Sequence, residues 1–365
     1  MTEDFHRDLG GRIIETADAI GVVADYGRPT RTAMAVRNGA GVIELRYGVV
    51  EVRGTDREAF INNTVSVDVP RSDAEGTYGF LLDPQGRITA DMFILAGADR
   101  VLCLMHPQVT GSIVEEWQGR VFIQDVEITD ASRSYRVMEV HGPQATEKVA
   151  SVLTGPGAPA DPFEVVRGAI GETGVVVMAG DGLLGEEMFM IIGARDAGEL
   201  LLDRLLTMGI GAIPFGMETY RALAVEAGTP LFPDELEGVI PNTFDLATGV
   251  DFTKGCFVGQ EVVSKVQNVG RPSRELVGLR SPGAFAAGTD IIHADTAIGR
   301  VTATGQQTGG TDCLGLGIVA RDQVGAGATV AVDGEPVTVA NLPFTEGSQP
   351  SGRRPRSGQA PSQTE

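Results

Sequence analysis

Two spacings of apolar residues alternate along the first 270 residues of the chain. Short runs rich in β-branched and aromatic residues predict strands: 42–45, 49–52, 78–82, 88–95, 101–105, 121–128, 135–141, 174–178 and 188–192. Apolar residues at helical spacing predict helices: 4–20, 30–36 (capped by Thr30), 57–62, 109–118, 144–153, 197–208, 218–226 and 260–268. Sequential strands with interleaved helices predict the α+β class.

From residue 275 the pattern changes to short strands interrupted by Gly, Ser and Pro. Strands are expected at 276–279, 298–304, 314–319, 329–332 and 337–344, which is typical of a small β-barrel. Residues 346–365 lack large apolar side chains and are expected to be disordered.

Composition indicates a globular protein in solution. Hydrophobic residues make up 42% of the 365 positions, and no apolar run is long enough to span a membrane. The acidic N-terminus lacks the features of a secretory signal, so a cytoplasmic location is expected. The three cysteines and four histidines are scattered along the chain, so we expect neither a disulfide framework nor a metal site.

The formal net charge is −20, and only Lys148, Lys254 and Lys265 are lysines among 29 basic residues. Such a surface repels nucleic acids and anionic membranes, so neither is expected as a partner. An acidic, lysine-poor surface is also typical of proteins that work in high salt, and a halophilic source is expected.

The densest polar chemistry lies in residues 251–261. Cys256 falls just before a predicted helix and close to Lys254, two features that stabilise a thiolate. From spacing alone, a reactive thiol and a merely packed cysteine remain equally open.

The segment reads Lys254-Gly255-Cys256-Phe257-Val258-Gly259-Gln260-Glu261. It resembles the K-G-C-[FY]-x-G-Q-E signature of the YgfZ family, folate-binding relatives of the glycine cleavage T protein (aminomethyltransferase). The resemblance extends over about residues 31–345 and includes Val52–Val69 and Arg221–Pro230.

The resemblance implies a three-domain ring around bound tetrahydrofolate. Its first α+β domain would comprise residues 1–45 and 132–270, its second α+β domain residues 46–131, and its barrel residues 271–345. By the family's motifs Glu226 would bind the pterin, Cys256 would face the site as the reacting group, and Lys254, Gln260 and Arg221 would contact the cofactor. The implied role is support of iron–sulfur cluster assembly or repair, with folate and iron–sulfur client or assembly proteins as partners.

Two departures from the family patterns matter. Aminomethyltransferases usually carry paired aspartates after the hairpin turn, whereas this chain has Ala90 and Asp91. The Y-T-G-E-x-G-[FY]-E segment is reduced here, with Met190 in place of its final glutamate. Asp91 remains a candidate for assisting transfer at the folate nitrogen. Three functions stay open: the iron–sulfur role, aminomethyl or methyl transfer to tetrahydrofolate, and folate binding without catalysis.

Overall fold

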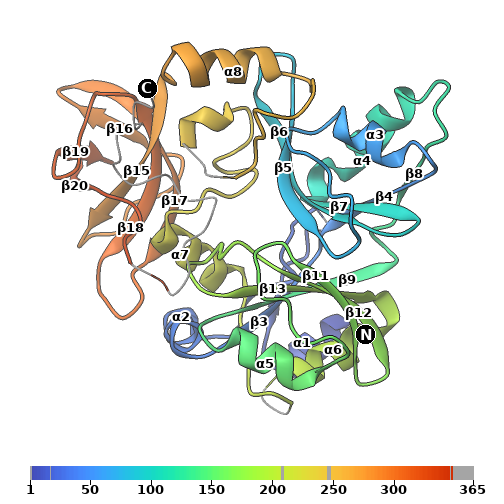
Figure 1. Cartoon of the computed structure of the whole chain (residues 1–365). Coiled ribbons are helices and arrows are strands. Elements are labelled where there is room, and N and C mark those ends of the chain that lie inside the picture. The colour runs from blue at the N-terminus through green and yellow to red at the C-terminus, as the bar shows by residue number, and fades with distance from the viewer. Residues whose placement is uncertain (1, 17, 207–208, 245–247, 346, 348–365) are drawn as a thin grey trace.

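The computed structural model describes residues 2–16, 18–206, 209–244, 248–345 and 347. Of the tail for which disorder is predicted, residues 346–365, only Gly347 lies among the described residues. Two sheets and a barrel form three lobes, with the barrel on the left of Figure 1 and the five-stranded sheet on the right. None of the described helices has the length and apolar character needed to cross a membrane.

The first sheet has seven strands in the order β10-β11-β12-β13-β9-β3-β14. Their bounds are β3 Gly41–Leu45, β9 Tyr135–His141, β10 Leu153–Thr154, β11 Val165–Ile170, β12 Thr173–Ala179, β13 Met188–Ala194 and β14 Ile213–Pro214. One face is covered by α5 (Ala145–Val152) and α6 (Gly198–Leu205), which share a core with that face. The chain leaves this sheet after β3 and returns at β9, so the first lobe is discontinuous in sequence.

The second sheet is formed by the intervening residues, in the order β5-β6-β7-β4-β8. Its strands are β4 Gly48–Arg53, β5 Gly76–Leu82, β6 Ile88–Ala96, β7 Arg100–Met105 and β8 Glu127–Asp130. Two helices, α3 (Arg57–Asn62) and α4 (Pro107–Gly119), cover its outer face.

The inner faces of the two sheets share one core. Residues of β6 alternate between cores: Phe93 and Leu95 belong to the shared one, whereas Met92 and Ile94 pack under α3 and α4. This alternation follows from the two-residue period of a strand. The first sheet contributes Val137 of β9 and Met190 of β13 to the shared core.

The barrel closes in the order β15-β18-β17-β16-β19-β20, with β20 paired to β15. Its strands are β15 Arg274–Ser281, β16 Asp290–His293, β17 Thr296–Gln306, β18 Cys313–Ala320, β19 Thr329–Val332 and β20 Glu335–Ala340. It encloses its own apolar core. Helix α7 (Met217–Ala227) packs on β17 and β18 and so joins the barrel to the first sheet.

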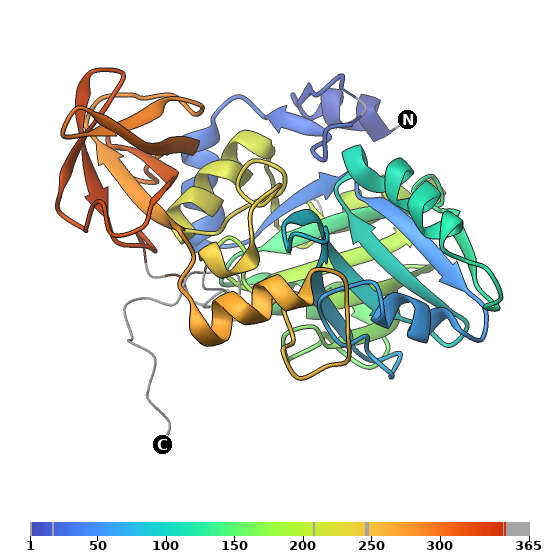
Figure 2. The same ribbon diagram turned by 90° about the horizontal axis from the view of Figure 1, so that it is seen from above.

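Helix α8 (Gln260–Val269) connects the far sides of the ring. It runs from the β5–β6 end of the second sheet to the barrel (Figures 1 and 2). The shorter elements are α1 Thr2–Asp8, β1 Arg12–Ile13, β2 Val23–Asp25, α2 Pro29–Asn38, η1 Arg195–Ala197 and η2 Pro241–Phe244.

Several element predictions were wrong in part. The helix predicted over 4–20 ends at Asp8, because Gly10 adopts a φ of 82° and the chain then forms β1. Thr30 does not cap α2: the N-cap is Arg28, and Pro29 fills the first turn. The strand predicted from 121 begins only at Glu127, and β11 and β16 were missed because glycine or short length masks their pattern.

Candidate functional site

A cavity lies where the two sheets, α7 and the segment after α7 meet. It measures about 60 Å³, and with its open mouth it holds about 580 Å³ free of protein atoms. Its lining is aromatic with a few polar groups: Ile20, Tyr47, Tyr78, Asp91, Met92, Phe93, Leu104, Met105, His106, Leu183, Met217, Tyr220, Arg221, Leu231, Phe232 and Asp234. An apolar, aromatic lining with a few polar groups is typical of small-molecule sites.

Asp91 is the lining carboxylate that the sequence singled out. It lies on β6, next to its pairing partner strand β5. Tyr78 of β5 donates its phenol proton to Asp91 Oδ2 at 2.8 Å, which fixes the carboxylate toward the cavity wall. The tyrosine ring is buried and packs edge-on against Phe80. A carboxylate held this way can accept or return a proton at a bound ligand.

Arg221 lines the same cavity from α7, so the structure brings it and Asp91 together. Its guanidinium lies 3.2 Å from Asp234 Oδ2, an acid that the sequence did not single out. About half of the Arg221 side chain is exposed, so the cation can still meet an anionic group of a ligand.

His106 is a second lining residue that sequence reasoning missed. It caps α4, where its Nδ1 accepts the N–H of Gln108 at 3.3 Å. Burial lowers the pKa of His106, so the ring is neutral at neutral pH and carries its proton on Nε2. The cavity therefore has an imidazole donor in its wall. Only its place directly before a helix-starting proline distinguishes it in the sequence.

Tyr47 connects the cavity to a buried polar chain. Its phenol donates to Glu139 Oε1 at 2.8 Å, and Glu139 Oε2 lies 2.8 Å from His141 Nε2. Glu139 and His141 are fully buried on β9. These hydrogen bonds hold the Tyr47 side chain at the edge of the cavity.

Glu226, predicted to bind a pterin, is 1% exposed near the end of α7 and is not part of the cavity lining. One of its carboxylate oxygens lies 3.2 Å from Arg37 of α2, and the other accepts the backbone N–H of Thr308 in the barrel. Arg37 also lies 3.2 Å from Glu186, which matches the first glutamate of the Y-T-G-E-x-G-[FY]-E segment. These two motif glutamates thus converge on one arginine that sequence reasoning missed.

Lys254 is half-buried and holds the loop between α3 and β5. Its Nζ donates to the backbone oxygens of Asn62, Val65 and Val67 at 2.7, 2.8 and 2.5 Å. An ammonium has three protons, so these carbonyls occupy all of them. Burial lowers the pKa of Lys254 to about 8. The cation therefore tethers residues 62–67, and binding a cofactor would require it to release one of these carbonyls.

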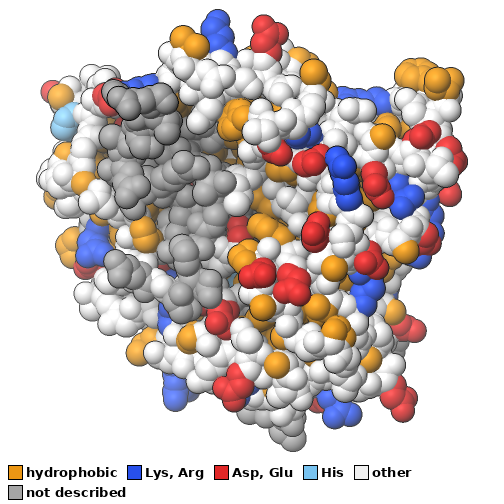
Figure 3. Space-filling model, viewed as in Figure 1, with side chains coloured by type: hydrophobic (Ala, Val, Ile, Leu, Met, Phe, Trp, Pro, Cys, Tyr) orange, Lys and Arg blue, Asp and Glu red, His pale blue; other side chains and the backbone are white. Residues whose placement is uncertain are grey.

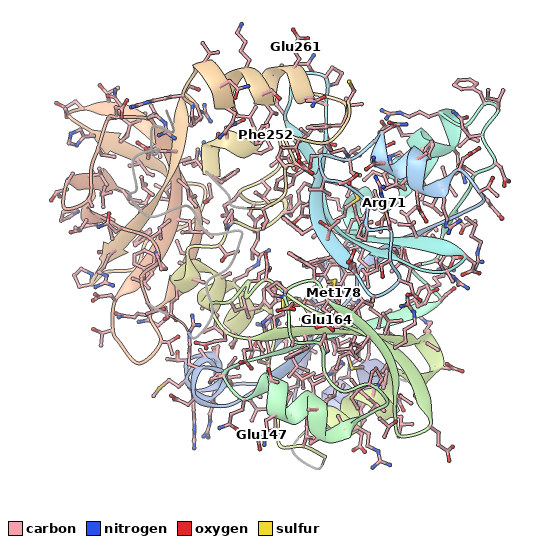
Figure 4. All side chains as sticks on the ribbon, viewed as in Figure 1. Arg71, Glu147, Glu164, Met178, Phe252 and Glu261 are labelled. Carbon is pink, nitrogen blue, oxygen red and sulfur yellow. The ribbon has the colours of Figure 1, made fainter. Side chains whose placement is uncertain are left out.

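The rest of the motif docks α8 on the β5–β6 hairpin. Gly259 has a φ of 78°, and a Cβ there would lie 2.6 Å from the Asp83 carbonyl oxygen. Phe257 is buried, with its ring centroid 5.5 Å from Lys254 Nζ. Figure 4 shows Phe252 in the loop below α8 and Glu261 on the outer side of the helix. The close approach of two loops explains why glycine is needed here.

Cys256 is exposed four residues ahead of Gln260, the first residue of α8. Neither Cys256 nor Gln260 lines the central cavity. Cys103 is buried, which raises the pKa of its thiol to about 12, and Cys313 is half-buried. Within the described residues no three His, Cys, Asp or Glu side chains are grouped to hold a metal ion.

Glu235, beside the cavity residue Asp234, is 2% exposed, and its Oε2 accepts the Leu231 N–H at 2.9 Å. Burial, aided by Asp234, raises its pKa from 4.5 to about 7. The folded protein thus binds more protons than the unfolded chain between these values, so this residue makes stability fall as pH rises across that range. Glu235→Gln should remove the dependence and stabilise the protein above pH 7 by about 3 kcal/mol at most.

Denaturant unfolding of both proteins at several pH values measures this. A difference between the wild type and Glu235→Gln that stays constant from about pH 4.5 to 8 would contradict the assignment.

Comparison with known proteins adds a family context. Residues 3–254 match the family model of the GCVT N-terminal domain. An aminomethyltransferase of Alkaliphilus oremlandii is 28% identical over 308 residues, covering 82% of this chain and 83% of the relative. One from Herpetosiphon aurantiacus is 27% identical over 360 residues, covering 93% and 96%.

The fold has a counterpart among solved structures. The glycine cleavage system aminomethyltransferase T from Bartonella henselae superposes with a TM-score of 0.82 at 20% identity, over 95% of this chain and 97% of that one. This confirms the predicted fold class, two α+β lobes followed by a C-terminal β-barrel. The two sheets share one core, and residues of the second sheet line the cavity described above.

Proposed function

Because the chain belongs to the family of the GCVT N-terminal domain, we propose that it transfers an aminomethyl or related one-carbon group to tetrahydrofolate in the central cavity. The observation that carries this is the cavity itself, where aromatic walls surround Asp91 held by Tyr78. Relatives named aminomethyltransferase, aligned over most of their length, support the same activity.

The residues present fit a folate in chemical character. Tyr47, Tyr220 and Phe232 contribute aromatic rings to the lining, and aromatic rings are the usual packing partners of a pterin; polar groups belong to the same lining. Tetrahydrofolate would supply the nucleophilic nitrogen that accepts the one-carbon unit.

In this proposal Asp91 holds or moves the proton at that nitrogen, and Tyr78 keeps its carboxylate in one orientation. His106 donates from Nε2, and Arg221 offers a cation at the mouth. The aromatic walls exclude water from the reacting atoms.

Glu226, Lys254 and Gln260 remain proposed folate contacts on the strength of the family motifs alone. Glu226 would have to exchange Arg37 or the Thr308 N–H for the ligand, because both its oxygens are already engaged. Gln260 starts α8 outside the cavity lining.

The direct test uses the purified full-length chain, tetrahydrofolate and an aminomethyl-lipoyl donor protein. Formation of methylene-tetrahydrofolate and release of ammonia above a no-enzyme control is the expected result. Folate binding without product would exclude this transfer and favour a binding module.

A second function rests on a different observation. Cys256 is exposed within a complete eight-residue match to the YgfZ signature, and the transferase proposal gives it no part. We therefore also propose that the chain supports iron–sulfur assembly or repair through client or assembly proteins that contact this thiol. One thiol cannot hold a cluster by itself, so a partner would supply the remaining ligands.

Replacing Cys256 with Ala separates the two functions. Since the side chain is exposed, Cys256→Ala should leave the folding free energy within about 0.5 kcal/mol of wild type. Under the iron–sulfur proposal it should abolish complementation of a strain deficient in cluster repair, while methylene-tetrahydrofolate formation is unchanged. Full complementation by Cys256→Ala would remove the thiol from the mechanism. Ser112→Ala, another exposed single-atom deletion, is the matched control.

The setting of the protein is also a proposal. A net charge of −20 with three lysines fits work in a salt-rich cytoplasm. Figure 3 shows acidic and basic side chains interspersed over one face, so the excess of acids is not gathered into a single patch there.

A further inference from the structure

The residues that follow the barrel fold back over the end of α7. After β20, residues 341–345 and 347, here called the C-terminal strap, run from the barrel to the loop between β12 and β13. The N–H of Phe344 donates to the backbone oxygen of Glu226 at 2.9 Å. Gly347 lies so close to the Gly185 carbonyl oxygen that a Cβ on Gly347 would overlap that atom. The strap therefore connects the barrel, α7 and the first lobe.

Glycines make room for the strap where it leaves the barrel. A Cβ at Gly278 of β15 would lie 2.8 Å from the Phe344 ring, and one at Gly228 would lie 3.0 Å from the Leu342 Cβ. Both apolar side chains of the strap stay partly exposed, and Arg280 Cζ lies 5.7 Å from the centroid of the Phe344 ring. A terminal segment with partly exposed anchors is of the kind that opens locally without unfolding the rest.

The strap contacts the chain at both glutamates that converge on Arg37. It touches the backbone of Glu226 itself and of Gly185, the neighbour of Glu186. The two glutamates are 1% and 5% exposed, and each lies 3.2 Å from the Arg37 guanidinium. When ionised, two carboxylates beside one guanidinium leave an excess of negative charge in a place hidden from water. Such a place offers hydrogen-bond acceptors to a ligand rich in N–H donors.

The closed arrangement leaves polar atoms unsatisfied. Arg37 Nε, Thr308 Oγ1 and Thr345 Oγ1 are buried and find no hydrogen-bond partner among the described residues. Thr345 belongs to the strap, and Thr308 is the residue whose N–H binds Glu226. Buried polar groups are normally hydrogen-bonded, so these atoms favour a second state in which the strap opens and a polar ligand takes its place.

We propose that the C-terminal strap controls access to Glu226: the strap in place encloses the carboxylate, and its release opens the carboxylate to a ligand. The proposal rests on the proposed folate function, in which Glu226 contacts the pterin, and it accounts for the enclosure of that residue. The apparent affinity for such a ligand is the intrinsic affinity multiplied by the fraction of molecules whose strap is released. A variant with a released strap should therefore bind the ligand more tightly.

The first test needs no ligand. A water-soluble carbodiimide with an added amine modifies accessible carboxylates, and mass spectrometry gives the rate at each glutamate. In the wild type, Glu226 should react far more slowly than the exposed Glu261. Gly347→Leu has no room for its side chain against Gly185. It should raise the Glu226 rate at least about tenfold, as expected when a mostly closed state becomes open, and leave the Glu261 rate unchanged.

The second test measures tetrahydrofolate binding to the same full-length proteins by calorimetry. Gly347→Leu should lower Kd by about tenfold. Phe344→Ala, which removes the ring that anchors the strap on the barrel, should change both readouts in the same direction and serves if Gly347→Leu does not fold. Gly325→Leu is the matched control, because Gly325 is exposed and a Cβ there meets no atom within 4 Å. It should keep the wild-type values in both tests.

Each result decides a different point. Glu226 labelling that is equal in the wild type, Gly347→Leu and Phe344→Ala would overturn the strap, whatever the ligand does. The same increase in Gly325→Leu would overturn it as well, because general loosening would then explain the labelling. Faster labelling with an unchanged Kd would show that access to Glu226 does not limit binding, against the proposal. Faster labelling in proteins that all fail to bind tetrahydrofolate would instead overturn the proposed function.

Discussion

Asp91→Asn is expected to lower kcat for aminomethyl transfer to tetrahydrofolate by about 10²–10⁴-fold, the usual range for a general acid–base residue. Asparagine has the same shape and can still accept the Tyr78 phenol proton, but it cannot take up a proton at neutral pH. Because the loss falls on proton transfer, KM should change much less than kcat. Initial rates of methylene-tetrahydrofolate formation over a range of folate concentrations measure both constants.

Tyr78→Phe is the matched comparison, since it keeps the carboxylate and removes only the 2.8 Å hydrogen bond that orients it. Its kcat should fall by roughly tenfold, less than for Asp91→Asn, because the reacting group remains. Thermal unfolding of each variant shows whether the fold is retained. An Asp91→Asn enzyme with near wild-type kcat would exclude Asp91 as the proton-transfer group.

Lys254→Met is expected to lower the free energy of unfolding by about 2–4 kcal/mol. The substitution keeps most of the side-chain volume but leaves the carbonyls of Asn62, Val65 and Val67 without their shared donor. Unsatisfied groups of this kind cost about 1–3 kcal/mol each, and water can reach some of them because the site is only half-buried. The midpoint and slope of denaturant unfolding give the change.

Lys265→Met provides the control for this experiment. Lys265 is exposed on α8 and should change stability by no more than about 0.5 kcal/mol. If the two variants were equally stable, the three hydrogen bonds of Lys254 would contribute nothing, and its place in the motif would have to be explained by ligand binding.

Local signals predicted much of the fold. The helix over 57–62 and the strand over 135–141 have the predicted bounds. In each, the apolar residues that define the pattern lie within a few positions: Phe60 and Ile61 in the helix, and the run from Tyr135 in the strand. The hairpin at Asp83–Gly86 was predicted because turn residues separate two apolar runs. Strand β11 was not predicted, because Gly168 interrupts its apolar pattern.

The site was harder to predict, because its members come together only in three dimensions. Asp91 and Arg221 were singled out through family motifs, and both line the cavity. Tyr47, His106 and Asp234 carry no motif, and nothing local shows that strands far apart in sequence bring them to one place. The polar segment at 251–261 contributes no residue to the cavity lining; within it, Lys254 holds residues 62–67 and Gly259 allows α8 to approach the β5–β6 hairpin.

The core shared by the two sheets has a consequence for how the molecule melts. The two sheets bury their inner faces in one core, to which α2, α7 and the segments after α7 also contribute, so neither sheet can open without exposing apolar side chains of the other. Val49 and Ala131, at the two ends of the inserted sheet, lie close together and are joined by a 2.8 Å backbone hydrogen bond. Removing the residues between them would nevertheless uncover the inner face of the first sheet. The barrel has its own core and touches the rest mainly through α7. Two cooperative units are therefore expected in calorimetry, one comprising both sheets and one the barrel. The inserted second sheet should unfold together with the first sheet that flanks it in sequence.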